Sequence, residues 1–526
     1  MEDSLISRKR IFNAIFLVVI AILLSKVSGL ARDQIMAGYF GISYETDAFT
    51  WAYFIPNLFR ILFAESLIVA AFIPIYSSYL KRNERDELKI FVNSVTNIMI
   101  IIFFIISAVI FVLSPEIGIL LSKIANYQLD VTKFVFMSRI MIFSLVTLSL
   151  SGLATGVLNS HNIFTVPSLA PFVMNIVIII FTILFYSRFG IASMAIGVIV
   201  GSIFHLAIQF PQLKVSGVKY RFKIDFKHKA VKEIFSLMFP ILLSLGAVQL
   251  NNGVDNFFAL NLGGGNTTAL TLSWRVANLP LGVFSVAIIT VLYPLISRQA
   301  AGKNTRGLKE SFSLGVREIG YIMIPSTVGL AVLSYPIIKV LFEHFKFSSY
   351  DTEKVAYVLV FHCVGLLFFG LLMILNRVFY AFKDARTPLK VALVSIVINF
   401  VLDWILIKFM DVGGLALSTS LVALCNVTVL IILLRKKVGS LGGKRIIRSY
   451  GKVFLASAIM GTAVYLLWDW LSNFAYQGLW LLIILLFLTI IIGAVIYMFC
   501  TILFKMEEIK FVTGLFKNLK GRFNRK

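Results

Sequence analysis

The chain is a succession of long apolar segments separated by short polar connections. A helix needs about 20 apolar residues to cross a bilayer. Segments of this kind lie near residues 11–40, 46–79, 90–113, 131–158, 165–187, 190–211, 232–262, 268–297, 312–338, 352–380, 388–409, 413–434, 449–469 and 477–504. Only 14% of the residues are charged, against about 25% in soluble domains. The pattern predicts an all-α polytopic membrane protein with 14 transmembrane helices.

Basic residues crowd into alternate loops. The N-terminus, the C-terminal tail and the loops at 81–89, 212–232, 298–310, 381–390 and 435–452 hold about 35 Lys and Arg, and the other loops hold about six. The positive-inside rule therefore predicts that both termini are cytoplasmic. The same distribution accounts for the net charge of +24, so we expect membrane lipids as partners and no nucleic acid.

Motifs that would indicate catalysis or a bound cofactor are incomplete. At a Gly-Lys pair that resembles a P-loop, Ser297 replaces the first glycine and Asn304 replaces the Ser or Thr. The five histidines lack metal-ligand spacing, and the three cysteines all lie in apolar segments. We therefore expect a protein that is not an enzyme and has no cofactor, apart from a possible coupling ion.

The two halves of the chain repeat each other. Asp33–Gly41 matches Asp255–Gly263 at an offset of 222, and Val157–Pro167 matches Val378–Pro388 at an offset of 221. Asn175 with Asn399, and Gly190 with Gly414, match at 224. Because six spans separate equivalent points, both halves have the same orientation in the membrane. We predict two six-helix lobes related by a pseudo-two-fold axis along the membrane normal.

This repeat divides the chain into four parts. Residues 1–212 form the N-lobe, 213–231 a cytoplasmic amphipathic linker, 232–440 the C-lobe, and 441–526 two additional helices with a basic tail. Two lobes around a midplane site are expected to rock between inward-open and outward-open states. We place the outer gate near Gly41–Glu45 and Gly263–Asn266, and the inner gate near Ser77 and Ser297.

Charged residues inside the opening spans point to a polar cavity. Ser25, Lys26, Gly29, Arg32 and Asp33 fall within an arc of about 120° on one helix face. Each charge at the centre of a spanning helix costs about 2.5–3.5 kcal/mol on insertion scales. Several such charges are therefore expected to line a water-filled cavity that binds an anionic head group.

The intramembrane bases have two interpretations. For Arg139, Arg317 and Arg377 we favour the structural interpretation, in which each side chain reaches the end of its span or pairs with a carboxylate. We favour a functional role for the bases on the helices that open each repeat, which are Lys26, Arg32, Arg60 and Arg275. The nearby acids are Asp33, Asp47 and Glu65, so positive charge is in excess. This excess suits a pyrophosphate, whose oxygens match the fork of an arginine.

Several runs resemble the MurJ (MviN) family of lipid II flippases in the MOP exporter superfamily. The first run is SKVSGLARDQIMAGYFG…TDAFTWAYFIPNLFRILFAES…AAFIPIYSSY, which begins at Ser25. The others are Leu279–Phe284 with Tyr293-Pro294, and Arg377–Pro388. The resemblance extends to about residue 440, and the last two spans match only in kind.

The resemblance implies a flippase of the bacterial inner membrane that acts as a monomer. Its substrate would be lipid II, an undecaprenyl-pyrophosphate-linked muropeptide, moved from the inner to the outer leaflet through a cationic central cavity. Coupling to an ion or to the membrane potential is expected. The matching cavity positions are Lys26, Arg32, Asp33, Asp47, Asn57, Arg60, Glu65 and Arg275. The last two helices would form a groove for the lipid tail.

A second group of polar residues could bind a cation. Asn399 and Asp403 are four residues apart and share a helix face. With Asp255 and Thr419 they offer the oxygen ligands that a hard cation prefers. The positions resemble a sodium site described in the family, which implies a carbonyl ligand from Leu415. A polar cluster that only packs the second half is an equally open interpretation.

Two other functions remain open. A flippase for another polyprenyl-linked glycan would keep both the cavity and the tail groove. A cation-coupled multidrug exporter of the same superfamily would have twelve spans and a less basic cavity. The two additional spans and the excess of bases favour a lipid-linked substrate.

Overall fold

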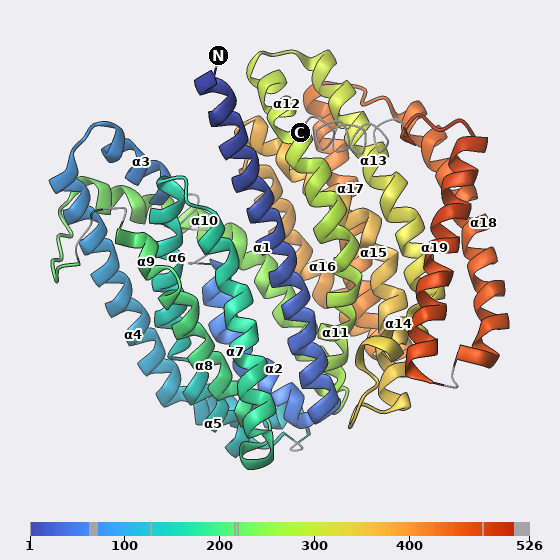
Figure 1. Ribbon diagram of the computed structural model, residues 1–526, viewed down its shortest axis with the longest axis horizontal. Coiled ribbons are helices and arrows are strands. Elements are labelled where there is room, and N and C mark those ends of the chain that lie inside the picture. The colour runs from blue at the N-terminus through green and yellow to red at the C-terminus, as the bar shows by residue number, and fades with distance from the viewer. Residues whose placement is uncertain are drawn as a thin grey trace. The chain divides into compact units, whose positions relative to one another are not determined.

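The protein is all-helical in the computed structural model, which describes residues 2–62, 72–126, 129–214, 217, 220–475 and 478–509 (Figure 1). Within these residues, 10 helices are long and apolar enough to cross a membrane. An eleventh span is formed if α13 (Thr305–Val332) and α14 (Ser334–Phe342), which are bent by 74° at Leu333, count as one. The prediction of a multi-pass helical membrane protein is confirmed.

The chain separates into two compact units, which we describe one at a time. The first contains Met1–Thr268 with His344–Phe347. Its helices are α1 (Glu2–Phe40), α2 (Tyr44–Phe59), α3 (Ile73–Lys81), α4 (Arg85–Ile124), α5 (Val131–Met141), α6 (Ser144–Ser160), α7 (Thr165–Phe189), α8 (Ala192–Ala207), α9 (Phe210–Leu213) and α10 (Lys229–Asn261).

Helix α7 packs against both α1 and α8. Close approach of α8 depends on small residues, because a Cβ added at Gly201 would lie 2.9 Å from the Met174 carbonyl oxygen. A separate apolar core joins α3, α4 and α6 and includes Phe72, Tyr76 and Phe91. The packing of α7 against α1 brings polar side chains of these two helices into contact.

The second unit contains Ala269–Glu343 and Ser348–Lys526. Its elements are most of α11 (Asn266–Pro280), the π-helical segment η3 (Leu281–Ser285), α12 (Val286–Ala301), α13, α14, α15 (Ser349–Ala381), α16 (Arg386–Met410), α17 (Val412–Val438), α18 (Gly443–Ala475) and α19 (Leu479–Leu503). Helix α18 packs against α13 and α19, and the three lie side by side (Figure 1). Gly320 permits the contact, because a Cβ there would overlap the ring of Tyr450.

Three turns recur with the same backbone conformation at a nearly constant offset. Asn83 (φ 59°) and Lys303 (φ 54°) precede α4 and α13 at an offset of 220. Asn162 (φ 62°) and Lys383 (φ 59°) precede α7 and α16 at 221. Helices α7 and α16 then have 25 residues each. The local backbone therefore follows the repeat found in the sequence.

The third turn corrects the register of the last two sequence matches. Gly190 (φ 54°, ψ −138°) ends α7, and Asp411 (φ 51°, ψ −138°) ends α16, again at an offset of 221. Gly414, which the sequence paired with Gly190, lies inside the first turn of α17. By the same offset Asn399 corresponds to Ile178 rather than to Asn175. Residue identity was misleading here, because the turn that needs positive φ uses a glycine in one half and an aspartate in the other.

The connection after α9 has no regular secondary structure where it is described, and it includes a turn at Phe226-Lys227 before α10. Side chains of α4 hold it. The N–H of Arg221 donates to Asn93 Oδ1 at 2.9 Å, and Asn97 Nδ2 donates to the carbonyl oxygens of Arg221 (3.1 Å) and Lys223 (3.0 Å). Ile224 packs on the apolar core of this unit, whereas Phe222 is exposed. The cytoplasmic location of this linker and the division into lobes on either side of it stay predictions.

Candidate functional site

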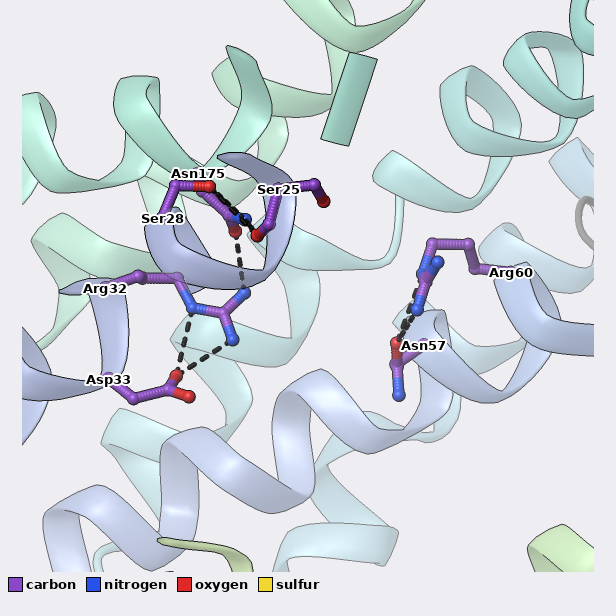
Figure 2. Close-up of polar contacts among 7 residues, drawn as sticks. All are labelled: Ser25, Ser28, Arg32, Asp33, Asn57, Arg60 and Asn175. Carbon is purple, nitrogen blue, oxygen red and sulfur yellow. Dashed lines mark hydrogen bonds and ion pairs between the residues drawn. The ribbon is translucent and has the colours of Figure 1, made fainter. Parts of the chain in front are cut away.

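Helix α1 carries a buried ion pair that also contacts α7 (Figure 2). The Arg32 guanidinium donates from Nη2 (2.9 Å) and Nε (3.2 Å) to Asp33 Oδ1, and from Nη1 (3.3 Å) to Asn175 Oδ1. The two charged side chains are only 12% and 4% exposed. Arg32 and Asp33 of the predicted polar face are therefore buried together, and Arg32 meets an amide from a neighbouring helix.

Asn175 connects three residues of α1 to α7. Its Nδ2 donates to Ser28 Oγ at 3.1 Å and to the Ser25 carbonyl oxygen at 3.4 Å, while its Oδ1 accepts from Arg32 (Figure 2). The sequence analysis did not assign Asn175 to the site. An amide in the middle of an apolar span was the available signal, since buried polar groups need partners.

Asn57 and Arg60 form a second polar pair at the end of α2. Arg60 donates from Nη2 (2.9 Å) and Nε (3.2 Å) to Asn57 Oδ1 (Figure 2). The charge of Arg60 also acts on His205 of α8. His205 Nδ1 is in turn 2.6 Å from Ser151 Oγ on α6. Arg60 thus faces a polar region made by α6 and α8, and His205 is a neighbour that the sequence analysis missed.

Asp47 binds main-chain groups at the start of α11. Its side chain is fully buried and accepts from the N–H of Gly265 (2.7 Å), the N–H of Thr268 (2.9 Å) and Thr268 Oγ1 (2.7 Å). These groups belong to the first turn of a helix, where N–H donors lack helical partners and a negative charge is favoured. Asp47 therefore ties the start of α2 to the start of α11.

Glycines let the two loops beside Asp47 touch. A Cβ on Gly264 would lie 2.7 Å from Tyr44 Cδ2, and one on Gly265 would lie 2.9 Å from the carbonyl carbon of Ile42. Gly265 also has a φ of +82°, which side-chain-bearing residues rarely adopt. The loops predicted to form the outer gate are thus in contact in this structure.

The remaining predicted site residues are placed separately. Lys26 is exposed on α1, and Arg275 is half-buried on α11 in the second unit. Glu65 lies outside the described residues. The structure therefore joins Arg32 to Asp33, and Asn57 to Arg60, as two local pairs.

Four of the five residues predicted to bind the cation lie in the second unit, as one pair on α16 and one pair on α17. Asn399 and Asp403 on α16 are fully buried, and Asn399 Nδ2 donates to Asp403 Oδ2 at 2.9 Å. Ser418 Oγ on α17 donates to Asn399 Oδ1 at 3.3 Å, and Thr419 Oγ1 donates to the Leu415 carbonyl oxygen at 3.1 Å. Carboxylate, amide, hydroxyl and carbonyl oxygens are a donor set that fits a hard cation. Asp255 is a buried residue of α10 in the first unit.

Comparisons with known proteins give a consistent family. The family model described as "Lipid II flippase MurJ" matches residues 36–497. The chain is 30% identical over 439 residues to a "Probable lipid II flippase MurJ" of Vibrio cholerae, covering 80% of this chain and 82% of that protein. It is 28% identical over 436 residues to a "Lipid II flippase MurJ" of Burkholderia cenocepacia, covering 81% and 84%.

Solved structures agree with these relatives. A structure described as "Lipid II flippase MurJ, inward closed conformation" matches with a TM-score of 0.78 at 28% identity, covering 94% of this chain and all of that one. An inward-facing multidrug resistance MATE transporter of the MOP superfamily matches with a TM-score of 0.67 at 13% identity, which shows the shared fold alone. The chain therefore belongs to the MurJ family of lipid II flippases.

Proposed function

We propose that this protein is a lipid II flippase that moves the undecaprenyl-pyrophosphate-linked muropeptide from the inner to the outer leaflet of the bacterial inner membrane. The observation that carries the proposal is the family match over residues 36–497, which includes most of the polar residues discussed above. The protein acts as a monomer, and both termini are cytoplasmic. It performs no catalysis, because translocation of the head group leaves its covalent bonds unchanged.

The head group is bound by the bases on the helices that open each half. Arg32 is held in place by Asp33 and Asn175, and Arg60 by Asn57, so both guanidinium groups have fixed orientations before an anion arrives. A pyrophosphate attracts such forks more strongly than a neutral head group does. Lys26 and Arg275 add charge, and the acids Asp33, Asp47 and Glu65 limit the excess.

Transport proceeds by alternating access between two six-helix lobes, with 14 transmembrane helices in all. The recurring turns at offsets of 220 and 221 support this arrangement, because equal local structure in both halves is what a repeat produces. The bonds of Asp47 to Gly265 and Thr268 support an outer gate that is closed in this structure. Opening requires these bonds to break.

Two further features serve this cycle. Helices α18 and α19 form the surface that accommodates the polyprenyl tail, and the exposed apolar side chains of α19, such as Phe487, Ile491 and Phe499, suit it. Asp255, Asn399, Asp403, Leu415 and Thr419 supply the ligands for Na⁺ as the coupling ion, in keeping with their oxygen donors.

Reconstitution tests the proposal. Purified protein in proteoliposomes should move fluorescent lipid II between leaflets, and empty liposomes should not. A polyprenyl-pyrophosphate that carries a different glycan serves as the competing substrate. Equal or faster movement of that competitor, or no movement of lipid II under any ion gradient or membrane potential, would reject lipid II as the substrate.

A further inference from the structure

A charged cluster joins α13 to the two C-terminal helices in the second unit. Arg317 Nη1 on α13 donates to Glu508 Oε1 at 2.6 Å and to Glu507 Oε2 at 3.2 Å. Both acids follow α19 in the chain. Ser449 Oγ on α18 also donates to Glu508 Oε1, at 2.9 Å, and Arg445 of α18 pairs with Glu507. Two bases and two acids are thus paired, although Arg317 Nε has no hydrogen-bond partner among the described residues.

Glu318, the next residue after Arg317, has no place in this set of pairs. Its side chain is completely buried. Among the residues that the structure describes, none donates a hydrogen bond to Oε1 or Oε2 of Glu318. A buried carboxylate without a donor is very unfavourable, and such a group is stable when it carries a proton.

The surroundings of Glu318 also disfavour a negative charge. Glu508, whose charge acts on Glu318, is itself an acid, and Arg317 already binds Glu508 and Glu507. The phenol groups of Tyr321 on α13 and Tyr497 on α19 lie within electrostatic reach of Glu318. Tyr497 donates to the Tyr321 carbonyl oxygen at 2.7 Å, and Tyr321 donates to Thr501 Oγ1 at 3.3 Å.

The other elements packed on α13 meet it through small and apolar residues at the positions where the contacts are closest. Leu292 of α12 and Ile374 of α15 pack at Gly315 of α13. Ser285 of η3 and Gly370 of α15 lie at a second close contact with α13. Four of the charged and titratable groups on these neighbours have partners of their own: Lys452 of α18 with the Phe504 carbonyl, Tyr450 of α18 with the Val316 carbonyl, Lys339 of α14 with Glu343, and Arg377 of α15 with the Tyr293 ring of α12.

We propose that Glu318 is a proton-binding site: it holds a proton at neutral pH while α13 is packed against α18 and the segment after α19, and releases it when that packing loosens. The ligand is H⁺, transferred to a carboxylate oxygen of Glu318 from water and returned to water. The site is distinct from the head-group residues and from the oxygen cluster around Asp403, and it does not depend on the proposed function.

Infrared spectroscopy of the purified full-length protein tests this directly. At neutral pH the wild type should show a C=O stretching band of a protonated carboxyl group that Glu318→Gln lacks. Glu310→Gln is the matched control, because Glu310 lies on the same helix, is exposed and pairs with Arg306. The control should keep the band. An identical band in wild type and Glu318→Gln would overturn the proposal.

Thermal unfolding supplies a second, independent measurement. The folded protein keeps the proton of Glu318 at pH values where the unfolded chain has lost it. As the pH rises from about 4.5 to mildly alkaline values, the melting temperature of the wild type and of Glu310→Gln should therefore fall more steeply than that of Glu318→Gln. Equal slopes in all three proteins would contradict the proposal. If Glu318→Gln and Glu318→Met both fail to fold, the site needs the negative charge, and the proposal is also overturned.

Discussion

The buried carboxylate of Asp47 accepts the main-chain N–H of Gly265 at 2.7 Å. This bond and the two from Thr268 join loops that are about 220 residues apart in the chain. The side chain of Asp47 thus accepts three hydrogen bonds at the place where we propose the outer gate, so its removal tests that proposal.

Asp47→Ala should open this contact. The change leaves two buried N–H donors without their acceptor, which costs about 1–3 kcal/mol for each unsatisfied group. A cysteine pair at positions 44 and 264, in a background without Cys363, Cys425 and Cys500, reports the closed gate. We expect a lower crosslinking yield in Asp47→Ala and an unchanged yield in the control Glu45→Gln. An undiminished yield in Asp47→Ala would show that other contacts close the gate.

Arg60→Ala should abolish flippase activity while membrane insertion and abundance stay near normal. The change removes a charge and a fork whose orientation Asn57 fixes. Arg60→Lys keeps the charge without the fork and should lose about tenfold in rate, since a bidentate phosphate contact is replaced by a point charge. Arg139→Lys serves as the control, because Arg139 is assigned no substrate role. Growth complementation with quantified membrane protein measures the effect, and full activity of Arg60→Ala would remove Arg60 from the site.

Asp403→Ala should abolish any stabilisation by sodium. The buried pair of Asn399 and Asp403 supplies an amide oxygen and a carboxylate, which are ligands that a hard cation prefers. The melting temperature of purified wild type should rise with Na⁺ and not with an equal concentration of choline. The same sodium response in Asp403→Ala would refute the assigned cation site.

Asp411→Gly should stabilise the protein. Asp411 has the same positive φ as Gly190, its counterpart at the end of α7, but only the glycine tolerates it without strain. Relief of the strain stabilises the folded state, and the greater backbone entropy that a glycine loses on folding offsets part of this. The free energy of unfolding should therefore rise by about 1 kcal/mol. Gly190→Ala is the reciprocal test and should destabilise, although no atom lies within 4 Å of the added Cβ. Unfolding midpoints of the two variants that move in the same direction would contradict the strain argument.

The Asp384–Lys437 pair should make the free energy of unfolding depend on pH in the acidic range. The ammonium of Lys437, 2.8 Å away, and then the N–H and hydroxyl of Thr387 lower the pKa of Asp384 below 3.8. A lowered pKa in the folded state gives stability that is present above about pH 4 and is lost as the pH falls through the folded-state pKa. For this partly exposed pair the gain is about 0.2–1 kcal/mol. Asp384→Asn should therefore be less stable than wild type at pH 6 and equally stable at pH 2. An equal difference at both pH values would exclude this linkage.

Sequence patterns predicted the parts of this protein that depend on local chemistry. The length of the apolar segments predicted the spanning helices. The arc that contains Arg32 and Asp33 was predicted because helical spacing alone determines which residues share a face.

Contacts between distant residues were harder to predict. Nothing in the sequence around Asp47 indicates that its carboxylate binds the start of α11. The donors there are main-chain N–H groups, which almost every residue carries. The Arg32–Asn175 contact depends on how α1 packs against α7. The register of the repeat was assigned wrongly at the end of α16. The turn there places Asp411 at a positive φ, where a glycine would be expected.

The central claim is that this protein carries lipid II across the inner membrane, and depletion in cells tests it most directly. Cells depleted of the protein should retain lipid II in the inner leaflet, where an externally added enzyme that cleaves its head group cannot reach it. Expression of wild type should restore cleavage, and expression of Arg60→Ala at equal abundance should not. Undiminished cleavage in depleted cells that contain no other lipid II flippase would contradict the account.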